Sequence, residues 1–347
     1  MRVAVYYANN DIRLEERPKP AIGAGELLVR IEASGICGSD VMEWYRIDRV
    51  PLVLGHEIAG TVVETGKAIT RFKPGDRVAV AHHVPCGVCR YCLDGHETVC
   101  ETLRKTNFDP GGFCEYVRVP AINVEKGVFL LPDNVSFEDA TFIEPLACVI
   151  RGQRRANFKK GTTVLVIGSG ISGLLHIKLA KANGAERIFA TDISDFRLKA
   201  AKRSGADHAI DAREYGPAKL KGHNDGRLAD LVIICASSQG AFEQGLRSVE
   251  RGGTVLIFSA AGKDALLPLS TNDIFWRSEV TITSSYAGSP RDHIEALEKI
   301  CFGKIMVHDM ITHRLPLQET GLGFKLVQEA KDSIKVIIEP NRIGLRG

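Results

Sequence analysis

The spacing of hydrophobic positions along this chain changes near residue 148. Before that point, short apolar runs such as ELLVRIEASG and GDRVAVAHHV are bounded by Gly, Pro and Asp, which is typical of strands. A cysteine-rich stretch at 86–112 is typical of a loop, and GGFCEYVRVP then returns to the strand pattern. We therefore expect a β-rich domain at residues 1–148.

After residue 148, apolar strands alternate with helical periods. TTVLVIGSGISGLLHIKLAKANG predicts a strand, a glycine turn and a helix, and further strands are expected at RIFATDIS, DLVIICASS, GGTVLIFSAAG and EVTITSSYAG. Helical spacing appears in DFRLKAAKRSG, which ends at Gly205, and in QGAFEQGLRSVE. This alternation predicts an α/β, doubly wound parallel sheet at residues 149–287. Residues 288–347 add a helix at RDHIEALEKI and a strand at SIKVIIEP.

Length and composition narrow the class of protein. At roughly 100–200 residues per domain, the 347 residues fit two domains. A net charge of +3 is too small to argue for nucleic acid or an anionic membrane as a partner. The chain has neither an apolar signal core nor a run of about 18 apolar residues. Four of the nine cysteines lie too close together for a disulfide framework, which favours metal ligation. We expect a cytoplasmic protein without a membrane segment.

A dinucleotide-binding turn follows the first strand of the second domain. Its GxGxxG pattern consists of Gly168, Ser169, Gly170, Ile171, Ser172 and Gly173. Glycines there allow a tight turn and a close approach by pyrophosphate, and the helix N-terminus offers N–H groups to the phosphates. Asp192, about 20 residues on, suits the ribose hydroxyls and favours NAD over NADP, although Arg197 can reach a 2′-phosphate. The alternative is a plain tight turn, with Asp192 capping the next helix.

Two groups of residues are candidate metal ligands. Cys86, Cys89, Cys92 and Cys100 supply four thiolates, which predicts a closed structural zinc site; an iron–sulfur cluster or ordinary reduced thiols are the alternatives. The second group is scattered and consists of Cys37 in GICGSD, His56 and Glu57 in LGHE, and Glu144 in FIEPLA. One thiolate, one imidazole and one carboxylate leave a coordination position open, as in catalytic zinc sites. The alternative for His56 and Glu57 is a structural hydrogen-bonded pair.

These motifs, in this order and over essentially the whole chain, resemble the zinc-dependent medium-chain alcohol dehydrogenase family. The resemblance rests on GHEIAGTVVETG with the later GDRV, the four-cysteine loop and the GxGxxG turn. It implies a GroES-like catalytic domain at the N-terminus, to which residues 288–347 return, and a Rossmann domain for NAD between them. It also implies two zinc ions per chain, one catalytic and one structural. It assigns Cys37 and His56 as catalytic zinc ligands, with either Glu57 or Glu144 as the carboxylate ligand.

The resemblance also implies a mechanism and further site residues. Zinc would lower the pKa of a substrate hydroxyl, hydride would pass to the nicotinamide, and a carbonyl would form. Ser39 would pass the proton of the substrate hydroxyl toward the cofactor ribose. Asp40 would form hydrogen bonds beside the zinc site without binding the metal itself. Cofactor contacts are expected from Phe258 and Ser259, and more loosely from Lys335 at the pyrophosphate.

Two departures from the family pattern concern the substrate cleft. Met42 stands where many relatives carry a relay histidine, so that Glu43 or solvent would take the proton. The stretch between Cys37 and His56 also looks shorter than usual, which implies a reshaped pocket.

The substrate expected from the sequence is a small secondary alcohol. EPLA and GSGISGLLHIKLAKANGA resemble the polyol (sorbitol) and L-threonine dehydrogenase branch, so that a polyol or sugar acid is expected, with L-threonine or another alcohol as the alternative. The segments that can face the cleft carry Trp44, Tyr45, Arg46, Arg49 and Arg104. Their arginines suit a carboxylate, although exposed arginines are also common on surfaces.

Two other classes of protein would require different features in the sequence. A zinc module for nucleic acid would need a basic stripe and a tandem partner, and the sequence has neither. A zinc-free quinone-reductase relative would lack the Cys37, His56 and Glu144 set, which this sequence has.

The assembly state is expected from the family. The strand EVTITSSY can pair across a two-fold axis, so that a homodimer or homotetramer is expected.

Overall fold

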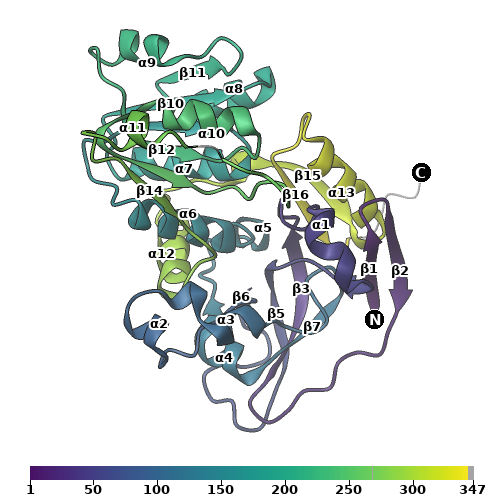
Figure 1. The fold of residues 1–347 in the computed structure, drawn as a ribbon. Helices are drawn as coiled ribbons and strands as arrows, with labels where there is room; N and C mark the ends of the chain where they lie inside the picture. The colour runs from purple at the N-terminus through teal and green to yellow at the C-terminus, as the bar shows by residue number, and fades with distance from the viewer. Residues whose placement is uncertain (268, 343–347) are drawn as a thin grey trace. The chain divides into compact units, whose positions relative to one another are not determined.

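The computed structural model describes residues 1–267 and 269–342, which form two compact units (Figure 1). The first unit takes Met1–Ala147 together with the C-terminal segment that begins at Ala287. The second unit takes Cys148–Tyr286. Both units are built on β-sheets, but the pairing of the strands differs between them.

Antiparallel pairing dominates the first unit. Its strands are β1 (Arg2–Ala8), β2 (Asp11–Glu16), β3 (Leu27–Gly35), β4 (Leu52–Val53), β5 (Glu57–Thr65), β6 (Arg77–Ala81), β7 (Tyr116–Val119), β8 (Val128–Leu130), β15 (Ile311–Pro316) and β16 (Lys335–Glu339). A small sheet has the order β2–β1–β4. The larger sheet has the order β15–β16–β3–β5–β6–β8, with β7 also paired to β3. The C-terminal strand β16 therefore joins a sheet that is otherwise largely built from the first 130 residues.

Helices of the first unit are mostly short. They are α1 (Glu43–Arg46), η1 (Ile47–Arg49), α2 (Arg90–Leu93), η2 (Glu97–Val99), α3 (Glu101–Lys105), α4 (Ala121–Gly127), α5 (Phe137–Ala140), α12 (Pro290–Cys301), η3 (His308–Met310), η4 (Leu317–Glu319) and α13 (Thr320–Glu329). The expectation of a plain loop at 86–112 was wrong, because α2, η2 and α3 lie there. Cys92 lies within α2, and Cys89 and Cys100 are the N-cap residues of α2 and α3.

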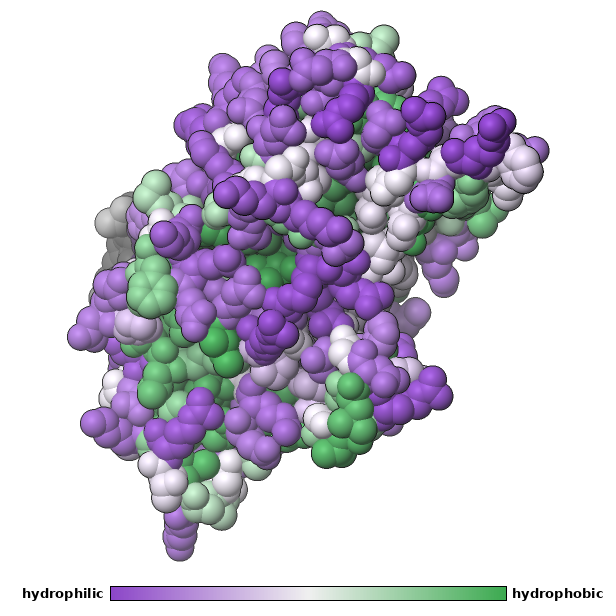
Figure 2. Space-filling view, turned by 90° about the vertical axis from the view of Figure 1, so that its left-hand side faces the viewer, coloured by the Kyte–Doolittle hydropathy of each residue, from purple (hydrophilic) through white to green (hydrophobic). Residues whose placement is uncertain are grey.

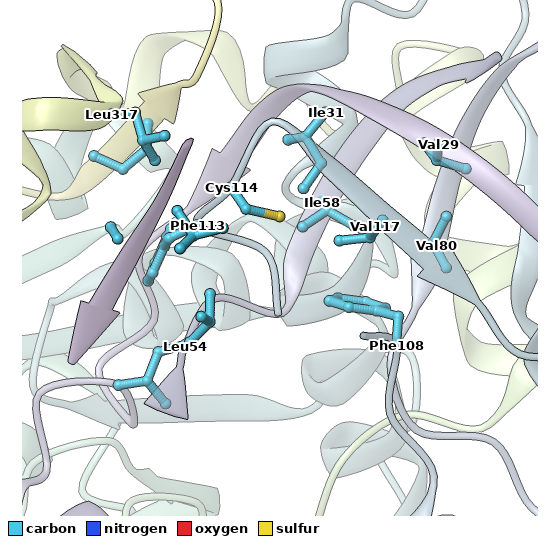
Figure 3. Packing of buried hydrophobic residues seen from close by; sticks show 14 of the residues in the cluster. Val29, Ile31, Leu54, Ile58, Val80, Phe108, Phe113, Cys114, Val117 and Leu317 are labelled. Atoms are coloured by element: carbon cyan, nitrogen blue, oxygen red, sulfur yellow. The ribbon is translucent and has the colours of Figure 1, made fainter. Parts of the chain in front are cut away.

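The core of the first unit lies against the larger sheet. Val29 and Ile31 alternate along β3 on its buried face, and neither is accessible to solvent. Figure 3 shows them together with Ile58, Val80 and Val117 from the neighbouring strands. Burial of large apolar side chains is the main term that stabilises such a sheet. The strand ends of this sheet are therefore held in place by a packed core.

Parallel pairing defines the second unit. Its strands are β9 (Thr163–Ile167), β10 (Arg187–Asp192), β11 (His208–Asp211), β12 (Ala229–Ile234), β13 (Val249–Ile257) and β14 (Thr281–Ser284). Its helices are α7 (Ile171–Ala182), α8 (Asp195–Ser204), α9 (Pro217–His223), α10 (Gln239–Leu246) and α11 (Thr271–Ile274), while α6 (Ile143–Arg155) begins in the first unit. The order β11–β10–β9–β12–β13–β14 is that of a doubly wound dinucleotide-binding sheet, which confirms the predicted fold class.

Local sequence explains most of these elements, with one correction. All five residues of β9 are buried, as expected for a central parallel strand, and α8 ends where Gly205 adopts φ +114°. The helix expected over QGAFEQGLRSVE instead ends at Leu246. Val249 begins β13, where it is buried and pairs with Ala229 of β12, so packing in the sheet outweighs its helical spacing.

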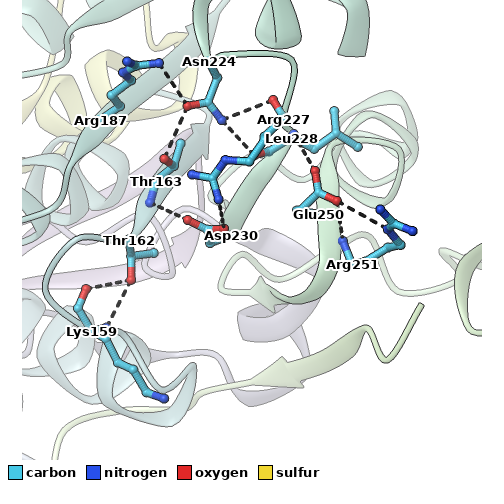
Figure 4. Close-up of polar contacts among 10 residues, drawn as sticks. All are labelled: Lys159, Thr162, Thr163, Arg187, Asn224, Arg227, Leu228, Asp230, Glu250 and Arg251. Atoms are coloured by element: carbon cyan, nitrogen blue, oxygen red, sulfur yellow. Dashed lines mark hydrogen bonds and ion pairs between the residues drawn. The ribbon is translucent and has the colours of Figure 1, made fainter. Parts of the chain in front are cut away.

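A polar network ties the amino ends of the central strands together (Figure 4). The backbone N–H of Thr163 donates to Asp230 Oδ2 at 2.8 Å, and the buried Asn224 amide donates to the carbonyl of Leu228 at 2.9 Å. Arg187 Nη1 lies 3.4 Å from Asn224 Oδ1. Buried polar groups need such partners. The network lies away from the carboxyl ends of β9 and β12, which are the ends where open α/β sheets bind ligands.

Hydropathy of the surface is shown for one face of the molecule (Figure 2). On the face shown in Figure 2, hydrophilic residues predominate, with smaller hydrophobic patches between them. Among residues 1–267 and 269–342, the structure contains no helix with the length and apolar content that a bilayer crossing needs.

Candidate functional site

Strand register in the first unit brings Cys37 next to His56. β3 and β5 pair antiparallel with Gly35 opposite Glu57, so the residues just beyond these two positions meet at the same edge of the sheet. Gly55, which directly precedes His56, adopts φ +90°, and an added Cβ there would lie 2.9 Å from the ring of Phe113. A glycine is therefore required at this bend.

The side chains at this edge form a metal-binding arrangement. Ligand atoms of Cys37, His56 and Glu57 all lie within 4.8 Å of one another. Zinc bonds of about 2.0–2.3 Å can span this separation, and a thiolate, an imidazole and a carboxylate are ligand types that zinc accepts. Asp40 Oδ1 lies 3.3 Å from His56 Nδ1, which leaves Nε2 as the ring nitrogen for a metal. The predicted residues therefore fit a zinc ion with an open position.

Electrostatics at His56 also favour a cation. Burial alone would lower the pKa of His56, but the negative charges of Asp40 and of the Cys37 thiolate outweigh burial and raise this pKa well above its usual value. Asp40 is fully buried and accepts a hydrogen bond from the backbone N–H of Cys37 at 3.0 Å. Asp40 therefore supports both the cysteine and the histidine of the group.

Glu57 has a buried cationic partner. Its carboxylate Oε2 contacts the ammonium Nζ of Lys335, and the two side chains are only 1% and 0% exposed. The pair crosses the position of Gly35, where an added Cβ would overlap both charged groups. Lys335, a predicted pyrophosphate contact, is therefore the ion-pair partner of a candidate zinc ligand.

Glu144 lies near this group but is not one of its three members. It stands in the first turn of α6 and lines a small cavity together with Glu57 and His293. Sequence reasoning did not single out His293 or His82. The ring of His82 lies 4.7 Å from that of His56, because Ala81 at the end of β6 pairs with Glu57. The pair of histidines in AHHVPC was the available signal.

Ser39 lies beside Cys37 Sγ, whereas Glu43, a candidate replacement for the relay histidine, makes its described contact with Asn9. Ser39 Oγ is 3.5 Å from Cys37 Sγ. Met42 is the N-cap residue of α1, and the carboxylate of Glu43 accepts the backbone N–H of Asn9 at 3.0 Å. The contact to Ser39 Oγ comes instead from Arg46, whose Nη2 lies 3.3 Å away.

The other candidate substrate contacts lie in exposed positions. Trp44 and Tyr45 are 43% and 41% exposed. Arg49 donates to the carbonyl of Tyr45 at 2.8 Å, and Arg104 pairs with Glu101 on the surface. Of the three arginines, Arg46 is therefore the one whose described contacts reach the candidate metal site.

The four clustered cysteines converge as predicted. Their ligand atoms lie within 4.8 Å of one another, and the Sγ–Sγ separations include 3.5 Å for Cys89–Cys92 and 3.6 Å for Cys86–Cys100. A tetrahedral zinc with Zn–S bonds of about 2.3 Å needs similar spacing. Burial would raise the pKa of Cys100, but hydrogen bonds from the backbone lower it to about 6, which favours the thiolate.

The glycine turn of the second unit has the geometry of a phosphate-binding loop. Gly168 adopts φ +91° directly after β9, and Gly170 is the N-cap of α7, so that Ile171 and Ser172 begin the helix. An added Cβ at Gly173 would overlap the carbonyl oxygen of Gly168. The turn thus leaves unpaired N–H groups at a helix N-terminus, where phosphates bind.

The predicted ribose contacts surround this turn. Asp192 ends β10, and its carboxylate accepts the N–H groups of Ser169 at 2.7 Å and Ser194 at 3.0 Å. The guanidinium of Arg197 lies 3.9 Å from where a Gly170 Cβ would stand, and its buried Nε has no hydrogen-bond partner among the described residues. These groups fit an adenosine ribose at the end of β10.

Phe258 and Ser259 follow β13 at the same edge of the sheet. The backbone N–H groups of Phe258 and Ser259 both lie 3.0 Å from the carbonyl of Ile234, the last residue of β12. Ser259 Oγ donates to the carbonyl of Ala236 at 2.8 Å. Both residues therefore stand at the carboxyl ends of the strands, where dinucleotides bind in this fold.

Comparison with known proteins identifies relatives over the whole chain. The family model for the alcohol dehydrogenase GroES-like domain matches residues 23–133, and that for zinc-binding dehydrogenases matches residues 172–301. Sorbitol dehydrogenase of Bacillus subtilis is 32% identical over 99% of this chain and 98% of its own. Sorbitol dehydrogenase of Bombyx mori is 34% identical over 96% and 97%. The crystal structure of galactitol-1-phosphate dehydrogenase from Escherichia coli superimposes with a TM-score of 0.86 at 27% identity, covering 98% and 100%.

Proposed function

The chain belongs to the zinc-dependent medium-chain alcohol dehydrogenase family, and from this premise we propose that it oxidises a secondary alcohol of a polyol or sugar acid to a ketone with NAD. The reaction converts one alcohol and one NAD⁺ into one ketone, one NADH and one proton, and it is reversible. The observation that carries the proposal is the convergence of Cys37, His56 and Glu57 within 4.8 Å at one edge of the sheet.

The residues of the first unit would hold a catalytic zinc ion. Cys37 and His56 are its proposed ligands, with Glu57 or Glu144 supplying a carboxylate. Zinc, when bound, supplies a Lewis acid that favours loss of a proton from the substrate hydroxyl. Asp40 keeps the His56 ring oriented by contact with Nδ1, and Ser39 offers a hydroxyl group to the substrate oxygen.

The residues of the second unit would hold NAD, which accepts the hydride. The N–H groups at Gly170, Ile171 and Ser172 would receive the pyrophosphate. Asp192 would bind the ribose hydroxyls, and its charge disfavours a 2′-phosphate. Further proposed contacts are Phe258, Ser259 and Lys335. Lys335 would contact the cofactor while its ammonium remains paired with Glu57.

A second zinc ion would be held by Cys86, Cys89, Cys92 and Cys100. Four thiolates complete a tetrahedral coordination shell, so this site would stabilise the loop that carries α2 and α3 and would not contact substrate. We therefore propose two zinc ions per chain.

The proposed substrate class is supported by the names of the relatives. Two of them are sorbitol dehydrogenases, and one solved relative is a galactitol-1-phosphate dehydrogenase. The test is a screen of NADH formation by the zinc-loaded protein with neutral polyols, sugar acids, inositols and L-threonine, with Cys37→Ser as the matched inactive control. The proposal expects turnover of a polyol or sugar acid that the control lacks. Exclusive turnover of L-threonine or of primary alcohols would contradict it.

We also propose that the protein is a homodimer or homotetramer. β14 is the last strand in the order of its sheet, and the neighbouring segment exposes Leu266 (86%) and Trp276 (71%). An edge strand with exposed apolar neighbours is suited to pairing with a second copy. Sedimentation measurements on the protein and on an Ile282→Pro variant test this pairing, and a monomeric wild-type protein would contradict it.

A further inference from the structure

Arg46 makes two hydrogen bonds to the residue that precedes Asp40. Its Nε donates to the backbone carbonyl of Ser39 at 3.1 Å, and its Nη2 donates to Ser39 Oγ at 3.3 Å. The Arg46 side chain is only 13% exposed, although it belongs to a short helix with otherwise exposed side chains. The guanidinium therefore points toward the candidate metal site.

Two further contacts hold the guanidinium in this place. Its Cζ lies 4.6 Å above the ring of Tyr45, which orients it by a cation–π contact. Its Nη2 lies 3.8 Å from Asp40 Oδ1, and the same Asp40 oxygen lies 3.3 Å from His56 Nδ1. Asp40 thus balances the charge of Arg46 and links it to a candidate zinc ligand.

The bond from Arg46 determines what the Ser39 hydroxyl can do. A hydroxyl has one proton to donate and two lone pairs, and a guanidinium has donors but no acceptor. Because Arg46 occupies a lone pair of Ser39 Oγ, the Ser39 proton remains available to another acceptor. Its hydrogen-bond acceptor among the described residues is Cys37 Sγ at 3.5 Å, which is a weak partner and a proposed metal ligand. A substrate oxygen bound at this site would be a better acceptor.

We propose that Arg46 is a positioning residue that directs the Ser39 hydroxyl at the substrate oxygen. The inference rests on the proposed function and adds a residue to it. Arg46 Nη2–H donates to Ser39 Oγ, and Ser39 Oγ–H donates to the substrate oxygen as that oxygen loses its proton to solvent water. A donor chain that ends on a cation is polarised, so it stabilises the negative charge that develops on the substrate oxygen.

This arrangement replaces a proton acceptor by a fixed positive charge. Met42, which stands where the family resemblance implies a relay histidine, has no group that carries a proton, and Glu43 accepts the N–H of Asn9. An arginine guanidinium stays protonated in proteins and has no acceptor atom, so Arg46 donates hydrogen bonds and takes up no proton from the substrate. Its contribution is therefore electrostatic, and its loss affects the rate of turnover more than the binding of the substrate.

The test compares Arg46→Gln and Arg46→Lys with a matched control, Arg13→Gln. Arg13 also stacks on a tyrosine ring, 4.3 Å above Tyr7, and pairs with a carboxylate, Asp11, but it lies on β2 and is largely exposed. We expect Arg46→Gln to lower kcat by about 10- to 100-fold, less than or similar to the loss of a donor in direct contact. The KM should change by less than about threefold. Arg46→Lys should recover part of kcat, since an ammonium can still donate to Ser39 Oγ.

A double-mutant cycle separates positioning from structure. In a Ser39→Ala background, Arg46→Gln should lower kcat by less than about twofold, because the hydroxyl on which it acts is gone. Zinc per chain and the unfolding temperature, measured on the same samples, report structural damage independently of turnover. Equal losses from Arg46→Gln in both backgrounds, or an unchanged kcat in the wild-type background, would overturn the inference.

The outcome is distinguishable from a failure of the proposed function. If none of the screened alcohols supports NADH formation by the wild-type protein, the proposed function fails before Arg46 is tested. If Arg46→Gln does not yield a zinc-loaded folded protein, Arg46→Lys takes its place in the same cycle. A several-fold loss that disappears in the Ser39→Ala background supports the inference, and an equal loss in both backgrounds overturns it.

Discussion

The ammonium of Lys335 contacts the carboxylate of Glu57, which lies 278 residues earlier in the chain, and neither side chain reaches solvent. β16 brings the lysine to the sheet edge where β3 ends, and the missing side chain of Gly35 leaves room for the pair. The ring of Phe142 lies 5.2 Å from the ammonium. The negative charge of Glu57 is thus compensated within the protein before any metal is considered.

Removal of Lys335 should destabilise the metal-free protein. Lys335→Met leaves a buried carboxylate without its cation, which costs about 3–5 kcal/mol when one partner of a buried pair is lost. Zinc should restore part of this loss, because its charge also compensates Glu57. The measurement is urea unfolding with and without bound zinc. Lys325→Met, an exposed lysine of α13, is the control and should stay within about 0.5 kcal/mol of wild type. Equal losses in the presence and absence of zinc would contradict a charge link to the metal site.

Local patterns in the sequence predicted the fold class and most strands of the second unit. Continuous apolar runs and the glycine turn are short-range signals, so that β9, the turn at Gly168 and α7 follow from a few neighbouring residues. The same local patterns predicted that helix α10 continues past Leu246, where it ends in the structure. The prediction failed because the burial of Val249 depends on its pairing with Ala229 of another strand. Such long-range packing outweighs local periodicity.

The candidate site was predictable only where a motif marked it. The clustered cysteines carry recognisable spacing, Cys37 and His56 lie in motifs of the family resemblance, and the structure brings each group together. The contacts of Arg46 with Ser39 and of His82 with His56 are ones that spacing does not encode. His82 reaches His56 through the register of β5 and β6, and Arg46 reaches Ser39 through the path of one short helix.

Loss of a proposed catalytic zinc ligand should abolish turnover and spare cofactor binding. Cys37→Ser and His56→Ala remove ligand atoms from the group in the first unit, whereas the glycine turn belongs to the second unit. NADH formation should fall below detection in both variants. Binding of NADH, followed by its fluorescence, should stay within about threefold of wild type, since no turn residue changes. Retained turnover in either variant would refute the ligand assignment.

Loss of a clustered cysteine should act on stability. Cys89→Ser removes one of four sulfurs that lie close enough to share a metal, so the zinc content should fall from two ions per chain toward one. Because binding of a structural metal contributes directly to folding, the unfolding temperature should fall. Cys301→Ser, at the last residue of α12, is the control and should retain both ions. A lower kcat in Cys89→Ser at an unchanged unfolding temperature would argue against a structural site.

Asp192 should set the preference for NAD over NADP. Asp192→Gly removes a carboxylate that is placed to bond ribose hydroxyls and to repel a 2′-phosphate, while Arg197 remains to attract one. The loss of charged hydrogen bonds of about 1.5–3 kcal/mol each predicts at least a tenfold weaker binding of NAD. Binding of NADP should weaken less or improve. Asp192 also accepts the N–H groups of Ser169 and Ser194, so the variant loosens the turn for both cofactors. The ratio of their dissociation constants is therefore the decisive measurement, with Asp192→Asn as the variant that keeps an acceptor for the turn. An unchanged ratio in Asp192→Gly would rule out the ribose contact.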